Sequence, residues 1–118
     1  MKIMIVDDNP KMRDLIQSML GEIAHERCEA KDGLEAVLKY SDELPDVVLM
    51  DIRMPVMSGI DATKRILQEN PSAKVVIVTE FDTPLYRDAA KKAGAKEYVL
   101  KENLHELNGK LISVMSVN

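Results

Sequence analysis

The stretch VVLMDIRMP, residues 47–55, runs four apolar residues directly into the acidic Asp51. A continuous apolar run of this kind is typical of a central strand in a parallel sheet, because helices cover such a strand on both faces. Pro55 cannot continue a strand ladder, so the strand must stop within a few residues of Asp51. The carboxylate of Asp51 is therefore expected at the carboxyl end of a buried strand.

Outward from this strand, short β-rich segments alternate with segments of helical periodicity. The expected strands are 2–6, 25–30, 46–51, 73–79 and 97–100. Proline at a helix start and glycine at a helix end mark boundaries in this pattern. They are Pro10 and Gly21 for the first helix, and Pro84 and Gly94 for the fourth, with Asp82 or Thr83 as its cap. The positions expected to face the core are Met12, Leu15, Ile16, Met19 and Leu20 in the first helix, Leu34, Val37 and Leu38 in the second, and Leu104, Leu107, Leu111, Ile112 and Met115 in the last.

Five strands that alternate with five helices imply βαβ units and a parallel sheet with right-handed crossovers. The sequence thus predicts an α/β protein, a flavodoxin-like (βα)5 fold with a doubly wound parallel sheet in the strand order 2-1-3-4-5. No change of composition or linker divides the chain, so residues 1–118 are expected to form a single domain. In such sheets ligands bind at the carboxyl ends of the strands, where the strand order reverses.

Composition excludes several classes of function. The net charge of −4 argues against direct binding of nucleic acid or of an anionic membrane. The longest apolar run is far shorter than the roughly 20 residues that a membrane span requires. Cys28 is the only cysteine, so neither an intrachain disulfide nor a cysteine-based zinc site can form, and a cytoplasmic location is expected.

Three carboxylates are expected to converge on the switch point of the sheet. Asp7 and Asp8 follow the first strand and Asp51 follows the third, and these strands are neighbours in the expected order. Two carboxylates about 5 Å apart repel by roughly 3 kcal/mol at an effective dielectric constant near 20. Lys101, after the fifth strand, supplies one compensating charge, and an all-oxygen set of ligands suits Mg²⁺. Asp8 is also placed to cap the helix that begins at Pro10, and the two roles are compatible.

Four segments in this order resemble the receiver domain of two-component response regulators. They are VDDN (6–9), LMDIRMPVMSG (49–59), VVIVT (75–79) and EYVLK (97–101), and the resemblance extends over essentially the whole chain. It implies that Asp51 accepts a phosphoryl group. It also implies that Mg²⁺ is held by Asp7, Asp8, Asp51 and the backbone carbonyl of Arg53.

The same resemblance implies a phosphorylation-activated signalling switch rather than a turnover enzyme. The phosphoryl donor would be a sensor histidine kinase or a phosphotransfer protein. Thr79 and Lys101 would bind the phosphoryl group, and Tyr98 would turn inward as Thr79 moves. The output would pass to an effector domain or target protein through the face made by the fourth helix, the fifth strand and the last helix. Dimerisation on phosphorylation is compatible with this resemblance. The chemistry agrees, because an ionised carboxylate needs no activating histidine.

Two residues depart from the family pattern. Glu102 follows Lys101 where a proline is usual, so a cis peptide bond is not expected there. Glu80 follows Thr79 where a small residue is usual. We hypothesise that Glu80 pairs with Arg53 across the mouth of the site and gates the approach of water and phosphodonor. In the alternative, both are solvated surface charges that contribute less than about 1 kcal/mol to stability.

Three other functions fit parts of the sequence. A Mg²⁺-dependent phosphatase with an aspartyl nucleophile usually has a second aspartate two residues on, where this chain has Arg53. A flavin carrier requires a phosphate-binding loop after the first strand, where Asp7 and Asp8 would repel phosphate. A receiver-like interaction scaffold that is not phosphorylated is favoured only by Glu80.

Overall fold

The computed structural model describes residues 1–116, which contain a five-stranded parallel sheet. The strands are β1 (Lys2–Val6), β2 (Glu26–Ala30), β3 (Val47–Met50), β4 (Val75–Thr79) and β5 (Glu97–Leu100). They are arranged in the order β2-β1-β3-β4-β5, and every neighbouring pair is parallel. The predicted (βα)5 flavodoxin-like fold is confirmed, and the reversal of strand order lies between β1 and β3 as expected.

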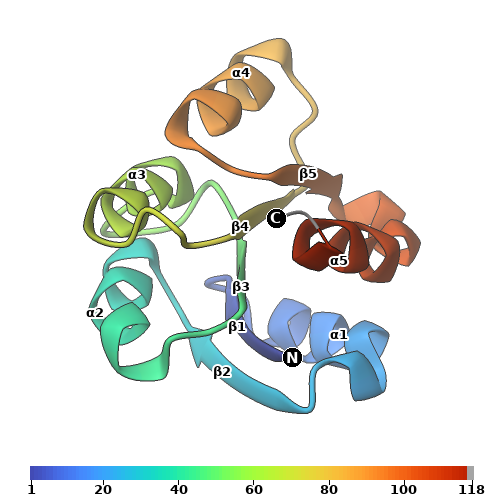
Figure 1. The fold of residues 1–118 in the computed structure, drawn as a ribbon. Helices are drawn as coiled ribbons and strands as arrows, with labels where there is room; N and C mark the ends of the chain where they lie inside the picture. The colour runs from blue at the N-terminus through green and yellow to red at the C-terminus, as the bar shows by residue number, and fades with distance from the viewer. Residues whose placement is uncertain (117–118) are drawn as a thin grey trace.

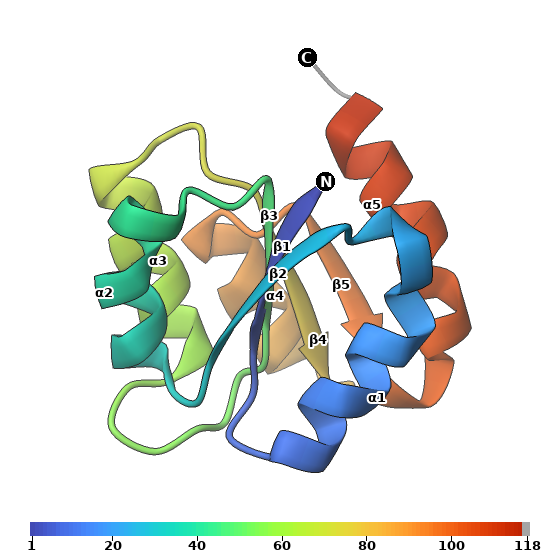
Figure 2. The ribbon, with the colours of Figure 1, turned by 90° about the horizontal axis from the view of Figure 1, so that it is seen from below.

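Five α-helices cover the two faces of the sheet. They are α1 (Pro10–Leu20), α2 (Gly33–Glu43), α3 (Gly59–Glu69), α4 (Pro84–Ala93) and α5 (Leu107–Ser116), with short 3₁₀ helices η1 (Gly21–Ile23) and η2 (Lys101–Glu106). Figure 1 shows α2, α3 and α4 on one face and α1 with α5 on the other. Seen from below, the sheet stands between these two layers (Figure 2). Within residues 1–116 no helix is long and apolar enough to cross a bilayer.

Two separate cores result from the alternation of side chains along each strand. In β1, Ile3 and Ile5 pack with α1 and α5, whereas Met4 and Val6 pack with the layer of α2, α3 and α4. All four side chains are at most 1% exposed. β3 and β4 are buried on both faces in the same way, which explains why their sequences are continuously apolar rather than alternating.

The boundaries of α1 and α4 follow the predicted signals with one exception. Pro10 begins α1 and Gly21 ends it, and Thr83 caps α4 by accepting a hydrogen bond from the Tyr86 amide. The cap of α1, however, is Asn9, whose side chain accepts from the backbone of the first turn. The prediction that Asp8 caps this helix is therefore wrong, which leaves the Asp8 carboxylate free of a capping role.

Three predicted helix faces need correction. In α2 the buried positions are Gly33, Ala36, Val37 and Tyr40, so the prediction that Leu34 and Leu38 point inward is wrong. Leu38 is 67% exposed, whereas the small residues Gly33 and Ala36 are buried on the other side of the helix. Two further sets of residues predicted to be buried are also substantially exposed. They are Leu15 and Met19 in α1 and Ile112 and Met115 in α5.

The last predicted helix begins later than its apolar stripe suggested. Leu104 lies in η2, where Asn103 interrupts the helical backbone, and α5 starts at Leu107. The buried stripe then continues through Leu111 and Val114. No cis peptide bond occurs in residues 1–116, so the bond after Lys101 is trans as predicted.

A close approach of backbones fixes the loop after β3. The Gly59 amide donates to the Ile52 carbonyl at 2.8 Å, which folds the loop back against the end of β3. A Cβ at position 59 would overlap the Asp51 carbonyl oxygen and crowd the Met50 side chain. Gly33 makes a similar approach to the Met57 carbonyl from α2. The backbone that carries Asp51 is thus held by packing that only glycine permits.

Replacement of Gly59 by alanine tests this packing. Gly59→Ala should lower the free energy of unfolding by about 3 kcal/mol or more, because the Asp51 backbone must shift to admit the new methyl group. Gly109→Ala is the matched control, since nothing lies within 4 Å of its added Cβ and it lies in α5. It should raise stability by about 1 kcal/mol through helix propensity. Urea denaturation followed by circular dichroism measures both; equal effects would contradict the close approach.

Candidate functional site

Three carboxylates meet at the carboxyl edge of the sheet between β1 and β3. Asp7, Asp8 and Asp51 each offer an oxygen within 4.8 Å of the others. Asp7 and Asp51 are buried, at 1% and 6% exposure, while Asp8 is open to solvent. The structure thus brings together the three acids that the sequence predicted to converge.

Asp51 is held in a fixed orientation by two hydrogen bonds. The Ile52 amide donates to its Oδ1 at 2.8 Å, and the Lys101 ammonium donates to its Oδ2 at 3.0 Å. Its own amide continues the ladder by donating to the Val6 carbonyl at 3.0 Å. Burial and these contacts define a single carboxylate position at the end of β3.

Lys101 balances two of the acids at once. Its Nζ lies 2.8 Å from Asp7 Oδ2 and 3.0 Å from Asp51 Oδ2, and its side chain is 15% exposed. The contact with Asp7 is an ion pair without hydrogen-bond geometry, so Asp7 Oδ2 is buried with no hydrogen-bond partner. One ammonium therefore stands against two carboxylates, and one buried oxygen lacks a donor.

Burial and charge move two pKa values in the site. Loss of solvation by burial raises the pKa of Asp51, and the nearby charge of Asp7 adds to this, outweighing the contribution of Lys101 in the other direction. Burial alone would lower the pKa of Lys101, but its contacts with Asp7 and Asp51 raise it above the ordinary value. The lysine therefore stays charged, while the negative charge on Asp51 is under electrostatic strain.

The residues present fit a divalent metal. The donors are all carboxylate oxygens, which Mg²⁺ prefers, and the set carries more negative charge than Lys101 offsets. Asp7 Oδ2 is the buried oxygen that a cation would satisfy. Asp7, Asp8 and Asp51 can hold such an ion.

Thr79 and Tyr98 are joined through the backbone of Phe81. Thr79 ends β4, is fully buried, and accepts a hydrogen bond from the Phe81 amide at 3.3 Å. The Tyr98 hydroxyl donates to the Phe81 carbonyl at 2.6 Å. Burial raises the pKa of Tyr98, partly offset by Arg87, so the hydroxyl remains a donor. Arg87 stacks on the Tyr98 ring at 4.5 Å from its centroid and donates to Asp82 at 2.6 Å.

The predicted ion pair between Arg53 and Glu80 is not formed. The Arg53 guanidinium instead lies over the Phe81 ring, 5.2 Å from its centroid. Glu80 is exposed, where water solvates its charge, whereas the half-buried ring of Phe81 offers a face to the cation. Sequence reasoning missed this contact and the Arg87 contacts, because long cationic side chains carry no periodic signal that identifies their partners.

Comparison with known proteins places the chain in a family. The response regulator receiver domain family matches residues 3–111. The chain belongs to this family.

Relatives of this receiver domain fall into two groups. It is 40% identical over 101 residues to the chemotaxis protein CheY of Thermotoga maritima, which covers 85% of this chain and 84% of that protein. It is 41% identical over 105 residues to the transcriptional regulatory protein LnrK of Bacillus subtilis, covering 86% of this chain but only 47% of the regulator. The receiver domain thus spans most of the first kind of relative and about half of the second.

Solved structures agree with this assignment. The response regulator domain of Thermotoga maritima CheB superposes with a TM-score of 0.89 at 29% identity, covering 100% of this chain and 98% of that one. CheY of Borrelia burgdorferi, in a complex with CheX, BeF₃ and Mg²⁺, superposes with a TM-score of 0.88 at 28% identity, covering 99% and 90%.

Removal of the lysine tests the charge balance of the site. Without Mg²⁺, Lys101→Met should lower the free energy of unfolding by about 3 kcal/mol, because it leaves two buried carboxylates without their cation. Lys92→Met is the control, since Lys92 pairs with Asp88 on the solvent side of α4 and should cost within about 0.5 kcal/mol. Urea titration of both variants is the measurement, and equal losses would show that Lys101 contributes no more than a surface charge.

The raised pKa of Asp51 predicts a pH-dependent effect of its neutralisation. Between the ordinary value of 3.8 and the raised value, the folded protein binds more protons at Asp51 than the unfolded chain does. The ionisation of Asp51 therefore makes stability fall as pH rises through this window. Asp51→Asn should be more stable than the wild type at pH 7, and the difference should shrink as pH falls towards 3.8. Denaturation midpoints across pH 4–7 test this; a difference that grows on acidification would contradict it.

Proposed function

We propose that this receiver domain is a switch that accepts a phosphoryl group on Asp51, with Mg²⁺, from a phosphohistidine of a sensor histidine kinase or phosphotransfer protein. The observation that carries the proposal is the position of Asp51, a buried, strained carboxylate within reach of Asp7, Asp8 and Lys101. The related Borrelia CheY structure, which contains Mg²⁺ and BeF₃, supports the same kind of site.

Asp51 acts as the nucleophile. Its carboxylate is ionised near neutral pH and held by Ile52 and Lys101, so it needs no base to activate it. A carboxylate oxygen forms the new bond to phosphorus while the bond to the donor nitrogen breaks. Asp7, Asp8, Asp51 and the Arg53 carbonyl would hold Mg²⁺, which would supply positive charge against the phosphoryl oxygens.

Lys101 and Thr79 bind the transferred group. Lys101 already contacts Asp51, and its raised pKa keeps it charged and able to pair with a phosphoryl oxygen. Thr79 exchanges its contact with the Phe81 amide, a long hydrogen bond of 3.3 Å, for one with the phosphoryl group. The loop after β4 is then free to move, because it has lost the bond that tied Phe81 to Thr79.

Tyr98 reports the change at the surface. Its hydroxyl is bonded to Phe81 in the loop that moves, so a shift of this loop breaks or redirects that bond. The population of two arrangements of α4, β5 and α5 is then shifted, and a target that prefers one of them completes the transition. This face is the output surface for a target protein or an effector domain, and dimerisation on phosphorylation would use it as well.

Two further predictions stay with this proposal. Residues 1–118 act as one domain, and the protein works in the cytoplasm, where kinase and phosphodonor are present. The relatives give two precedents for its output. The CheY protein is matched over most of its own length, whereas the transcriptional regulator continues beyond the matched domain.

Labelling with a small phosphodonor tests the acceptor. The protein incubated with acetyl phosphate and Mg²⁺ should gain a phosphoryl adduct of about 80 Da in intact-mass spectra, and chelation of Mg²⁺ should prevent it. Asp51→Asn should remove the adduct, because an amide is a poor nucleophile. Asp61→Asn is the matched control, since Asp61 is exposed in the first turn of α3.

Three outcomes would contradict the proposal. Labelling of Asp51→Asn at the wild-type level would place the acceptor elsewhere, and an absence of any adduct would favour the scaffold that is not phosphorylated. Steady turnover of small phosphoesters would instead favour the aspartyl phosphatase.

A further inference from the structure

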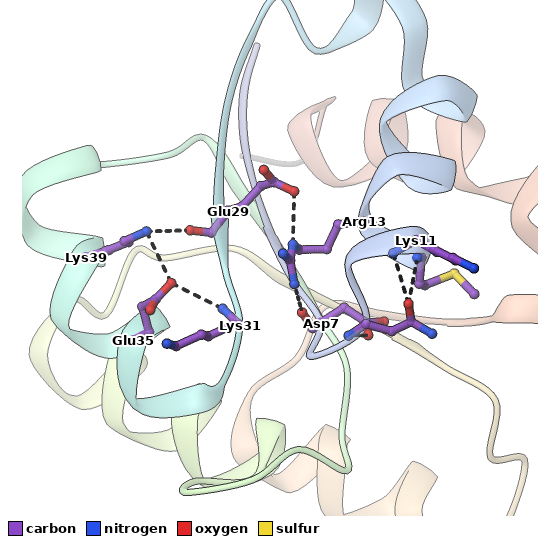
Figure 3. Close-up of polar contacts among 9 residues, drawn as sticks. Asp7, Lys11, Arg13, Glu29, Lys31, Glu35 and Lys39 are labelled. Atoms are coloured by element: carbon purple, nitrogen blue, oxygen red, sulfur yellow. Dashed lines mark hydrogen bonds and ion pairs between the residues drawn. The ribbon is translucent and has the colours of Figure 1, made fainter.

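Arg13 joins the acidic loop after β1 to the neighbouring strand β2. It lies in the first turn of α1, and its two donor groups point to different partners (Figure 3). The terminal nitrogen Nη1 donates to the backbone carbonyl of Asp7 at 2.7 Å, and Nε donates to Glu29 Oε1 at 3.0 Å. The side chain is 18% exposed, so both contacts are partly shielded from water.

Asp7 is fixed at nearly all of its polar atoms. Its amide donates to the Ala30 carbonyl at 3.1 Å, and its Oδ1 accepts from the Asn9 amide at 2.9 Å. Its carbonyl accepts from Arg13, and Oδ2 faces Lys101. Among these contacts, the side chains of Arg13 and Lys101 supply one each, and the one from Arg13 is to the backbone carbonyl.

The carbonyl of Asp7 also orients Asp8. The two residues share one planar peptide unit, so the direction of the Asp7 carbonyl sets the plane from which the Asp8 backbone continues. A rotation of this unit would displace the carboxylates of both residues relative to Asp51. A donor that fixes this one oxygen therefore controls two of the three acids.

We propose that Arg13 is a positioning residue for the metal-binding loop. Anchored to Glu29, it holds the Asp7 carbonyl and so keeps the carboxylates of Asp7 and Asp8 aimed at Asp51. This inference rests on the proposed function in taking Mg²⁺ as the ion of the site. Arginine suits the task because its planar fork reaches two acceptors in fixed directions, which a lysine ammonium does not reproduce.

The sign of the effect separates positioning from simple electrostatics. Arg13 carries a positive charge close to an acidic site, so its long-range field opposes the binding of a cation. If charge alone mattered, neutralisation of Arg13 would strengthen Mg²⁺ binding. Positioning predicts the opposite, since a displaced ligand pair binds the ion less well.

Mg²⁺ titration of the unphosphorylated protein, followed by amide NMR shifts of Asp8 and Ile52, tests the proposal. Arg13→Gln should weaken binding about tenfold, the effect typical of losing a residue that orients metal ligands. Arg13→Lys keeps the charge but not the fork, and should also weaken binding several-fold. Lys39→Met is the matched control. Lys39 belongs to the same polar network through the Glu29 carbonyl and Glu35 but does not contact Asp7, so affinity should stay within twofold (Figure 3).

Exchange of the Asn9 amide gives a second readout that requires no metal. This amide donates to Asp7 Oδ1, so a loosened loop should expose it, and its hydrogen exchange should be about fivefold faster in both Arg13 variants. Unchanged or tighter Mg²⁺ binding by Arg13→Gln, wild-type affinity of Arg13→Lys, or unchanged Asn9 exchange would each overturn the proposal. A wild-type protein that binds no Mg²⁺ would overturn the proposed metal site, while Asn9 exchange would still decide whether Arg13 fixes the loop.

Discussion

The contact of Lys101 with Asp7 and Asp51 is the interaction on which the site depends. Parallel pairing of β1 with β3 forces their carboxyl ends together, and each ends in an acid, so repulsion follows directly from the topology. Lys101 offsets only part of it from the end of β5. Burial raises the pKa of Asp51, and the remaining negative charge of Asp7 adds to this. The fold thus creates the electrostatic strain at Asp51.

The loops around this charge cluster are held by different means. The loop after β3 is fixed by the close packing of Gly59 against the Asp51 backbone. The loop after β1 is fixed by polar contacts, from Asn9 on one side and Arg13 on the other. The loop after β4 is held by contacts of Phe81: its amide donates to Thr79 at 3.3 Å, its carbonyl accepts from Tyr98 at 2.6 Å, and Arg53 stacks on its ring. The loops that carry the acids are thus fixed by close packing and short polar contacts, and the loop after β4 links Thr79 to Tyr98.

Sequence patterns predicted the sheet and the acids well because both depend on local signals. Continuous apolar runs identify buried strands, and the topology then brings Asp7, Asp8 and Asp51 together. The face of α2 was predicted wrongly because Gly33 and Ala36 contribute little hydrophobicity, although their small size is what allows close packing. Asn9 and Asp8 are equally good caps by residue type, so only the backbone could distinguish them. The partners of Arg13, Arg53 and Arg87 could not be predicted, because flexible side chains of this length reach several neighbours.

The order in which the chain is made gives the position of Lys101 a further consequence. Asp7, Asp8 and Asp51 all leave the ribosome before the lysine that offsets them, which follows β5 near the end of the chain. A nascent chain that has emerged only as far as β4 can pair β1 with β3, but this pairing brings the acids together without their counter-charge. The acids at the ends of β1 and β3 therefore lack this counter-charge until the segment that follows β5 has been made.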